Sequence, residues 1–180
     1  MSIASEESAP LFTRNQVVIL FLSALGLRLA YLAIVVAFDG NINNGSDSGK
    51  YLQLASNINQ FGGLVNWDLG VFGRDTGRMP LYPYFLAGIL DIAGEQRLWV
   101  VGVVQAFIDA STVFAIGLLA GAIDRRWALP AAILACVWTS LIILTSFVLA
   151  DTVFMAFFCW GLCACVWATR SERKFLLITA

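Results

Sequence analysis

Two aspartates, Asp47 and Asp151, are the side chains of this sequence best suited to acid–base chemistry. Asp47 follows the first long apolar run, and Asp151 is the single charge between Arg126 and Arg170. A carboxylate can take a proton from a hydroxyl group, and it can also ligate a divalent cation. Each aspartate also stands where a helical pattern begins, and aspartate is a favoured N-cap residue. The sequence therefore leaves two roles open for each, catalysis and helix capping.

Several cations lie in the same part of the sequence as Asp47. They are Lys50, Arg74, Arg78 and Arg97. The planar guanidinium of arginine can donate two hydrogen bonds to one phosphate group, which makes Arg78 the first candidate phosphate ligand and Arg74 the second. Lys50 stands about one helical turn beyond Asp47 and can add a further positive charge. Contact with lipid head groups, or ion pairing within the same segment, is the alternative role of these cations.

The composition sets limits on the class of protein. Of the 180 residues, 59% are hydrophobic and 13% are charged, and the mean hydropathy is +0.80. A soluble domain is less apolar and about one quarter charged, so the chain is expected to be an integral membrane protein. The net charge of −1 indicates no nucleic-acid partner. The absence of histidine excludes histidine metal sites and Ser-His-Asp triads.

Arg28 and Asp109 form a separate pair, because each interrupts the middle of a long apolar run. A single charge at the centre of a bilayer costs roughly 2.5–3.5 kcal/mol on insertion scales. We therefore expect the two side chains to form an ion pair between neighbouring helices. Its expected role is to fix these helices in place, and the alternative is a role in transport.

The apolar runs predict the helices that position these residues. A helix of about 20 apolar residues can cross a bilayer, and the runs of about this length are Val17–Phe38, Leu98–Ile123, Trp127–Leu149 and Thr152–Thr169. We therefore expect an all-α integral membrane fold, a polytopic bundle of about four spans. In this scheme residues 1–14 form a cytoplasmic segment and residues 15–180 form one transmembrane module. Phe175–Ala180 is expected to begin a fifth span, which continues beyond this chain.

A further apolar segment, Leu81–Ala93, is too short to cross a bilayer comfortably. If it does not cross, Arg14 and the Arg125-Arg126 pair share one side of the membrane, as the excess of positive charge in cytoplasmic loops requires. This topology places residues 39–97 in one large outer loop between the first two spans. It also places Asp151 on the outer face.

The outer loop is expected to contain interfacial helices. An amphipathic helical pattern starts at Asp47 and ends at Gly62, and Leu81–Ala93 supplies a second helix. Aromatic residues of the loop suit a folded segment seated at the lipid head groups. The predicted location is the inner membrane of a bacterium, with the site on its outer face.

Short motifs occur in a defined order from about residue 14 to the end of the chain. They are Asp47-Ser48-x-x-Tyr51-x-x-x-Ala55, Arg78-x-Pro80-Leu81-Tyr82-Pro83, Arg97-Leu98, Asp124-Arg125-Arg126 and Leu149-Ala150-Asp151-Thr152. With this order and spacing the chain resembles the amino-terminal module of the C-type (GT-C) membrane glycosyltransferases. The closer branch is that of the protein O-mannosyltransferases and the bacterial lipid A aminoarabinose transferases. Some relatives carry Asp-Glu where this chain has Asp47-Ser48, so any role of that second carboxylate is absent here.

The resemblance implies an enzyme that transfers a sugar from a polyprenyl-phosphate carrier to an acceptor hydroxyl, with inversion. The acceptor would be a glycan, a lipid or a protein. The catalytic aspartate that the family places in the first outer loop matches Asp47, and a supporting acidic residue at the next outer turn matches Asp151. No cofactor is certain, although a divalent metal bridges the two matching carboxylates in some relatives.

Two other functions are compatible with the sequence. A truncated relative that keeps the fold and lacks turnover would be a non-catalytic membrane partner, because full family members carry many more spans. A transporter subunit would use Arg28 and Asp109 inside the membrane. Transporters of the common classes do not need a large aromatic outer loop between their first two spans, which disfavours this alternative.

Overall fold

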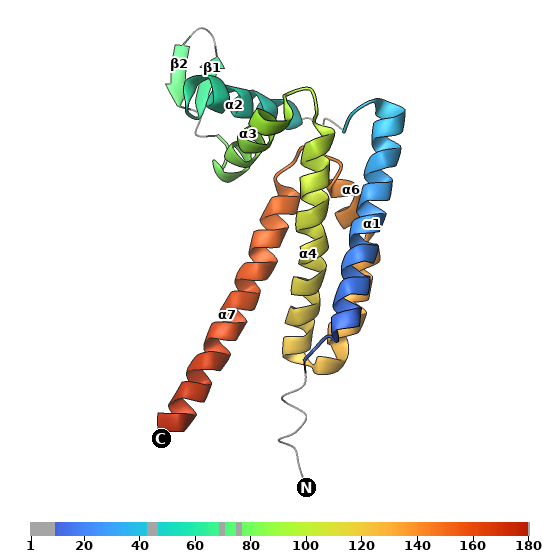
Figure 1. The fold of residues 1–180 in the computed structure, drawn as a ribbon. Coiled ribbons are helices and arrows are strands. Elements are labelled where there is room, and N and C mark those ends of the chain that lie inside the picture. Colours follow the sequence, from blue (N-terminus) through green and yellow to red (C-terminus); the bar gives the residue numbers. More distant parts are fainter. Residues whose placement is uncertain (1–9, 43–46, 69–70, 75–76, 180) are drawn as a thin grey trace.

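The computed structural model describes residues 10–42, 47–68, 71–74 and 77–179, and of residues 66–68, 71, 72, 74 and 170–179 it describes the backbone alone. Most of this part of the chain is helical (Figure 1). The described helices that are long and apolar enough to cross a membrane are α1 (Arg14–Asp39), α4 (Trp99–Ile123) and, over Asp151–Thr169, α7 (Asp151–Thr179). These are the features of a helical membrane protein, as the apolar runs predict.

The two ends of α1 are set by local sequence. Thr13 and Gln16 form a capping box, in which each side chain accepts a hydrogen bond from the backbone N–H of the other residue. At the other end Gly40 adopts φ 74°, a left-handed conformation that glycine tolerates best, and its N–H donates to the Val36 carbonyl. The first apolar run therefore starts and stops as one helix.

The central helix of the bundle is α4, which packs against α1 and α7 (Figure 1). Its glycines permit close approach. A Cβ atom at Gly102 would lie 2.7 Å from the Leu32 side chain, and one at Gly117 would lie 2.9 Å from the Ala128 carbonyl oxygen. Small residues at such contacts let helix backbones come close together in membranes. Through these glycines α4 packs closely against α1 on one side and against the segment that follows α4 on another.

The third apolar run does not form the single helix predicted over Trp127–Leu149, and this prediction was wrong. The run is divided into a 3-10 turn, η1 (Arg125–Trp127), and two helices, α5 (Ala128–Val137) and α6 (Thr139–Leu144), followed by the irregular segment 145–150. Trp138 separates α5 from α6 with φ −67° and ψ 112°, an extended backbone. The chain nevertheless returns toward the opposite end of the bundle from η1, where α6 lies (Figure 1).

The side chain of Arg28, in the middle of α1, stabilises this break. Its Nε donates to Asp109 Oδ2 at 2.5 Å, and both side chains are buried. Its Nη1 donates to the carbonyls of Ala24, at 3.0 Å, and Cys136, at 3.2 Å. The Cys136 carbonyl is among the last of α5, where a helix leaves its carbonyls without partners of its own. One guanidinium therefore joins α1, α4 and α5.

The segment between α1 and α4 folds over one end of the bundle and is called the cap below (Figure 1). It consists of α2 (Ser48–Phe61), β1 (Val65–Asp68), β2 (Val71–Arg74) and α3 (Leu81–Ala93). The two strands pair antiparallel, with Val65 opposite Arg74, and this hairpin was not predicted. The two cap helices pack together, and their side chains Leu54, Leu86 and Leu90 are buried.

The length and position of α3 bear on its relation to the membrane. The helix has 13 residues, which gives a length of about 20 Å at the α-helical rise. A bilayer core is about 30 Å thick, and α3 lies beside α2 instead of along the bundle (Figure 1). That α3 stays in the membrane interface remains a prediction, which this length and position support.

Loss of Asp109 should destabilise the protein more than loss of Arg28. Asp109→Leu leaves a buried guanidinium that cannot lose its charge, whereas Arg28→Leu leaves a carboxyl group that can take up a proton. Unfolding in detergent should therefore show the larger loss for Asp109→Leu, on the order of 3–5 kcal/mol. The double variant Arg28→Leu/Asp109→Leu should be more stable than Asp109→Leu alone. Equal stability of all three variants and the wild type would show that the pair does not hold the bundle together.

Candidate functional site

A cleft of about 340 Å³ lies where the cap meets the start of α7. Its polar lining consists of Arg78 and Asp151 together with two tyrosines, Tyr51 and Tyr82. Its apolar lining includes Met79, Leu81, Val153, Phe154 and Phe157. The last three of these lie on one face of α7, a helix of membrane-spanning length. The cleft therefore combines two opposite charges with an apolar wall that belongs to a candidate span.

Asp47 contacts this cleft through Arg78. The Arg78 Nη2 atom donates to Asp47 Oδ1 at 2.5 Å, and both side chains are half-buried. Asp47 occupies the N-cap position of α2 but makes no capping hydrogen bond with its side chain. The first turn of α2 is held by the backbone instead, since the Tyr51 N–H donates to the Asp47 carbonyl at 3.2 Å. The carboxylate of Asp47 thus binds the Arg78 guanidinium and does not cap the helix.

The guanidinium of Arg78 is held on a second side by aromatic rings. Its central carbon lies 5.6 Å from the centre of the Tyr51 ring, within the range of a cation–π contact. The Tyr51 ring in turn meets the Tyr82 ring edge to face, with centroids 5.0 Å apart. The buried Tyr82 is stacked on Phe85. Arg78 is therefore positioned by a carboxylate and by an aromatic group anchored in α3.

Asp151 is the first residue of α7, and its side chain is exposed at the cleft. Its carboxylate belongs to the first turn of this helix. The carboxylate of Asp151 also acts electrostatically on Tyr82. Burial raises the pKa of the Tyr82 phenol far above its ordinary value, and the neighbouring Tyr51 and Asp151 raise this pKa further. Tyr82 therefore remains a hydrogen-bond donor. Arg78 and Asp151 share one cleft, and Asp47 joins them through its ion pair.

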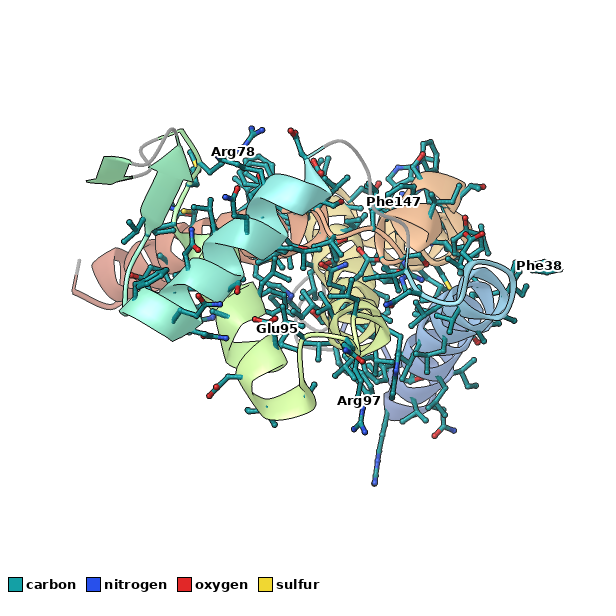
Figure 2. All side chains as sticks on the ribbon, turned by 90° about the horizontal axis from the view of Figure 1, so that it is seen from above. Phe38, Arg78, Glu95, Arg97 and Phe147 are labelled. Carbon is teal, nitrogen blue, oxygen red and sulfur yellow. The ribbon has the colours of Figure 1, made fainter. Side chains whose placement is uncertain are left out.

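The other predicted cations lie in different places. Lys50 is half-buried on α2 and does not line the cleft. Arg74 belongs to β2, and its side chain lies outside the described residues. Arg97 is exposed, and the view onto the cap shows it well away from Arg78 (Figure 2). Among the predicted phosphate ligands with described side chains, Arg78 is the one that lines the cleft.

Sequence reasoning missed Gln105, a buried residue of α4 that binds Tyr82, one of the residues lining the cleft. The Tyr82 hydroxyl donates to Gln105 Oε1 at 2.7 Å. Gln105 Nε2 donates to the carbonyls of Thr145, at 3.1 Å, and Phe147, at 2.9 Å. The available signal was a glutamine inside a long apolar run, because a polar group in a membrane helix needs a partner within the protein.

The described residues of the site do not fit a metal ion held by protein ligands alone. The carboxylates among them are Asp47 and Asp151, and Asp47 already binds Arg78. The part of the chain that the structure describes contains no group of three His, Cys, Asp or Glu side chains able to hold a metal. The positive charge of the described site is that of a guanidinium, and the chemistry below uses that charge.

Comparison of the chain with models of protein families, with curated proteins and with solved structures gave no match. The geometry of the cleft and the order of the sequence motifs therefore carry the functional argument.

Tyr82 should stay protonated at a pH at which an ordinary tyrosine has ionised, because its pKa lies above the usual value of 10.0. The ultraviolet absorbance of phenolate should therefore give the same alkaline titration step for the folded wild type and for Tyr82→Phe. In denaturing detergent, where the ring is exposed, the wild type should show one phenolate more. Unfolding above pH 10 frees this phenol to ionise, so the stability that it contributes falls as pH rises further. A smaller step for the folded variant would contradict this state of Tyr82.

Proposed function

We propose that this chain is the amino-terminal module of a GT-C type membrane glycosyltransferase, which moves a sugar from a polyprenyl-phosphate carrier to an acceptor hydroxyl with inversion. The observation that carries the proposal is the cleft in which Arg78 and Asp151 face a common space, with Asp47 bound to Arg78. An amphiphilic phosphate donor needs a cation for its head and an apolar surface for its chain, and both are present.

The donor phosphate binds Arg78. An arginine guanidinium carries several N–H donors on three nitrogens, and the contact with Asp47 uses Nη2. The remaining N–H groups can bind phosphate oxygens while the ion pair stays in place. Negative charge grows on these oxygens as the bond between sugar and phosphate breaks, and a fixed guanidinium stabilises that charge. Arg74 and Lys50 are secondary cations in this proposal.

The isoprenoid chain of the donor lies along α7. Phe154 and Phe157 line the cleft and are 58% and 63% exposed, so they offer apolar surface to a lipid. Both precede a long apolar stretch of the same helix. A chain that leaves the cleft along this face enters the hydrocarbon region directly.

Asp47 is the general base of the proposed reaction. Its carboxylate takes the proton of the acceptor hydroxyl while the acceptor oxygen forms a bond to the anomeric carbon. The bond from that carbon to the phosphate oxygen breaks in the same step, and polyprenyl phosphate leaves with the electron pair. A single displacement of this kind inverts the configuration. Asp151, across the cleft, orients the donor or acceptor through its carboxylate.

The proposed orientation places the cap on the outer face of a bacterial inner membrane. α1 starts, at Arg14, at the end of the bundle opposite the cap, and the chain also turns at this end through η1, which contains Arg125 and Arg126 (Figure 1). Such cations favour the cytoplasmic side. The transporter alternative has less support, because Arg28 and Asp109 are buried against each other and do not line the cleft.

Asp47→Asn should reduce sugar transfer by about 10²–10⁴-fold, because asparagine keeps the shape of the side chain and cannot accept the proton. The assay uses the full-length protein in nanodiscs, with a panel of polyprenyl-phosphate sugars. Asp91→Asn, an exposed acid of α3 outside the cleft, is the matched control and should keep wild-type activity. Transfer by Asp47→Asn at the wild-type rate would remove Asp47 from the mechanism. A wild type that binds carrier without any transfer would instead favour the non-catalytic partner.

Arg78→Ala should weaken binding of polyprenyl phosphate by about 10–100-fold, the usual effect of losing hydrogen bonds to a charged group. Arg78→Lys should recover part of the loss, since lysine restores the charge without the fork. Binding is measured in nanodiscs, and Arg97→Ala, which changes an exposed arginine away from the cleft, is the control. Equal affinities for Arg78→Ala and the wild type would refute the phosphate-binding role.

A further inference from the structure

Gln105 uses its whole side-chain amide in hydrogen bonds, although it lies in the middle of an apolar helix. It accepts from the Tyr82 hydroxyl through Oε1 and donates through Nε2 to the carbonyls of Thr145 and Phe147. Gln105, Tyr82 and Thr145 are all buried. The bonds connect three parts of the protein that are distant in sequence, namely the cap, α4 and the segment before α7.

The two carbonyls lie in the segment between α6, which ends at Leu144, and α7, which begins at Asp151. Among the described residues, neither carbonyl accepts a hydrogen bond from a backbone N–H. A carbonyl buried away from water without a donor costs about 1–3 kcal/mol. Gln105 supplies donors to two carbonyls and thereby fixes the path of the chain just before Asp151. Phe147, which is labelled in Figure 2, belongs to this segment.

The same amide is tied to the opposite wall of the cleft. Its Oε1 holds the Tyr82 hydroxyl, the Tyr82 ring supports Tyr51, and Tyr51 lies under the Arg78 guanidinium. One end of the network therefore leads to Arg78 and the other end to Asp151. Gln105 itself does not line the cleft.

We infer that Gln105 is a positioning residue that sets the placement of Asp151 relative to Arg78 across the cleft. This inference rests on the proposed function for its kinetic consequence, but its structural consequence can be measured without any activity. Because Gln105 acts through the chain before Asp151 and through Tyr82, its loss should alter the geometry of catalysis more than the affinity for the carrier.

Gln105→Leu keeps the approximate size of the side chain and removes all three hydrogen bonds. Turnover per folded molecule should fall by about 10–100-fold, since a displacement of about 1 Å at a reacting group has an effect of this size. The KM for the carrier should stay within about threefold of wild type, because Arg78 remains. Gln105→Glu, which when protonated keeps an acceptor for Tyr82 and one donor for a carbonyl, should recover part of the turnover.

Hydrogen exchange of the backbone amides supplies the readout that does not depend on activity. In Gln105→Leu the amides of residues 145–151 should exchange faster, while those of α1 and the second half of α4 keep wild-type protection. Thr112→Val is the matched control, because Thr112 is equally buried on α4 and, within the described part of the chain, its hydroxyl bonds to the Ile108 carbonyl of its own helix and to no other segment. This variant should keep wild-type turnover and wild-type exchange at 145–151.

The outcomes separate the two proposals. If the wild type transfers no sugar, the proposed function fails, and faster exchange at 145–151 in Gln105→Leu still supports the positioning role. Unchanged exchange in that segment, or unchanged turnover in an active enzyme, overturns the positioning role. A rise in KM without a fall in turnover also overturns it, because Gln105 would then act in binding.

Tyr82→Phe covers the case in which Gln105→Leu does not fold. It removes one hydroxyl and leaves Gln105 Oε1 without its donor, while the ring contact with Tyr51 remains. The inference requires lower turnover with an unchanged KM for this variant, together with faster exchange at 145–151. Wild-type values of turnover and exchange would overturn it.

Discussion

The interior of a bilayer offers no water to charged or backbone groups, so each must find its partner within the protein. The guanidinium of Arg28 supplies such partners on three helices through its Nε and Nη1 atoms, whereas its buried Nη2 has no hydrogen-bond partner among the described residues. It neutralises Asp109 on α4 and binds the Cys136 carbonyl near the end of α5. An apolar residue at position 28 would leave both groups unpaired in the core of the bundle. The break between α5 and α6 is therefore possible because α1 and α4 carry the polar groups that it requires.

Gln105 applies the same solution nearer the cap. Gln105 and Asp109 lie about one helical turn apart and so share one face of α4. Asp109 reaches the Cys136 carbonyl through Arg28, whereas Gln105 binds the carbonyls of the 145–150 segment directly. One polar face of α4 thus supplies hydrogen-bond partners, directly or through Arg28, along the broken third apolar run. Because that run ends two residues before Asp151, the same face of α4 also influences where the Asp151 carboxylate lies in the cleft. Stability of the bundle and geometry of the candidate site therefore depend on the same few hydrogen bonds.

The apolar runs predicted the helical membrane class, and residue type and position relative to these runs indicated Arg78 and Asp151 as candidate site residues. Both inferences need only local sequence. The break at Trp138 was missed, since no glycine or proline marks it and the partner of the Cys136 carbonyl beside it is Arg28 of α1. The capping role of Asp47 also failed, because a cation distant in the sequence competes for the carboxylate. Gln105 could be seen as polar, but its role exists only in contacts between segments that the sequence does not bring together.

The ion pair of Asp47 and Arg78 restricts how the proposed reaction can proceed. Inversion requires the base and the leaving phosphate on opposite faces of the sugar, and catalytic groups in that arrangement lie about 6.5–9.5 Å apart in inverting hydrolases. Asp47 occupies the Nη2 side of the guanidinium. A phosphate on the same side would lie too close to the base. Two oxygens bound at opposite sides of one guanidinium lie roughly 6 Å apart, given ordinary hydrogen-bond lengths. The proposed mechanism therefore needs the phosphate at the side of Arg78 away from Nη2, and the rigid fork of arginine, which lysine lacks, supplies that separation.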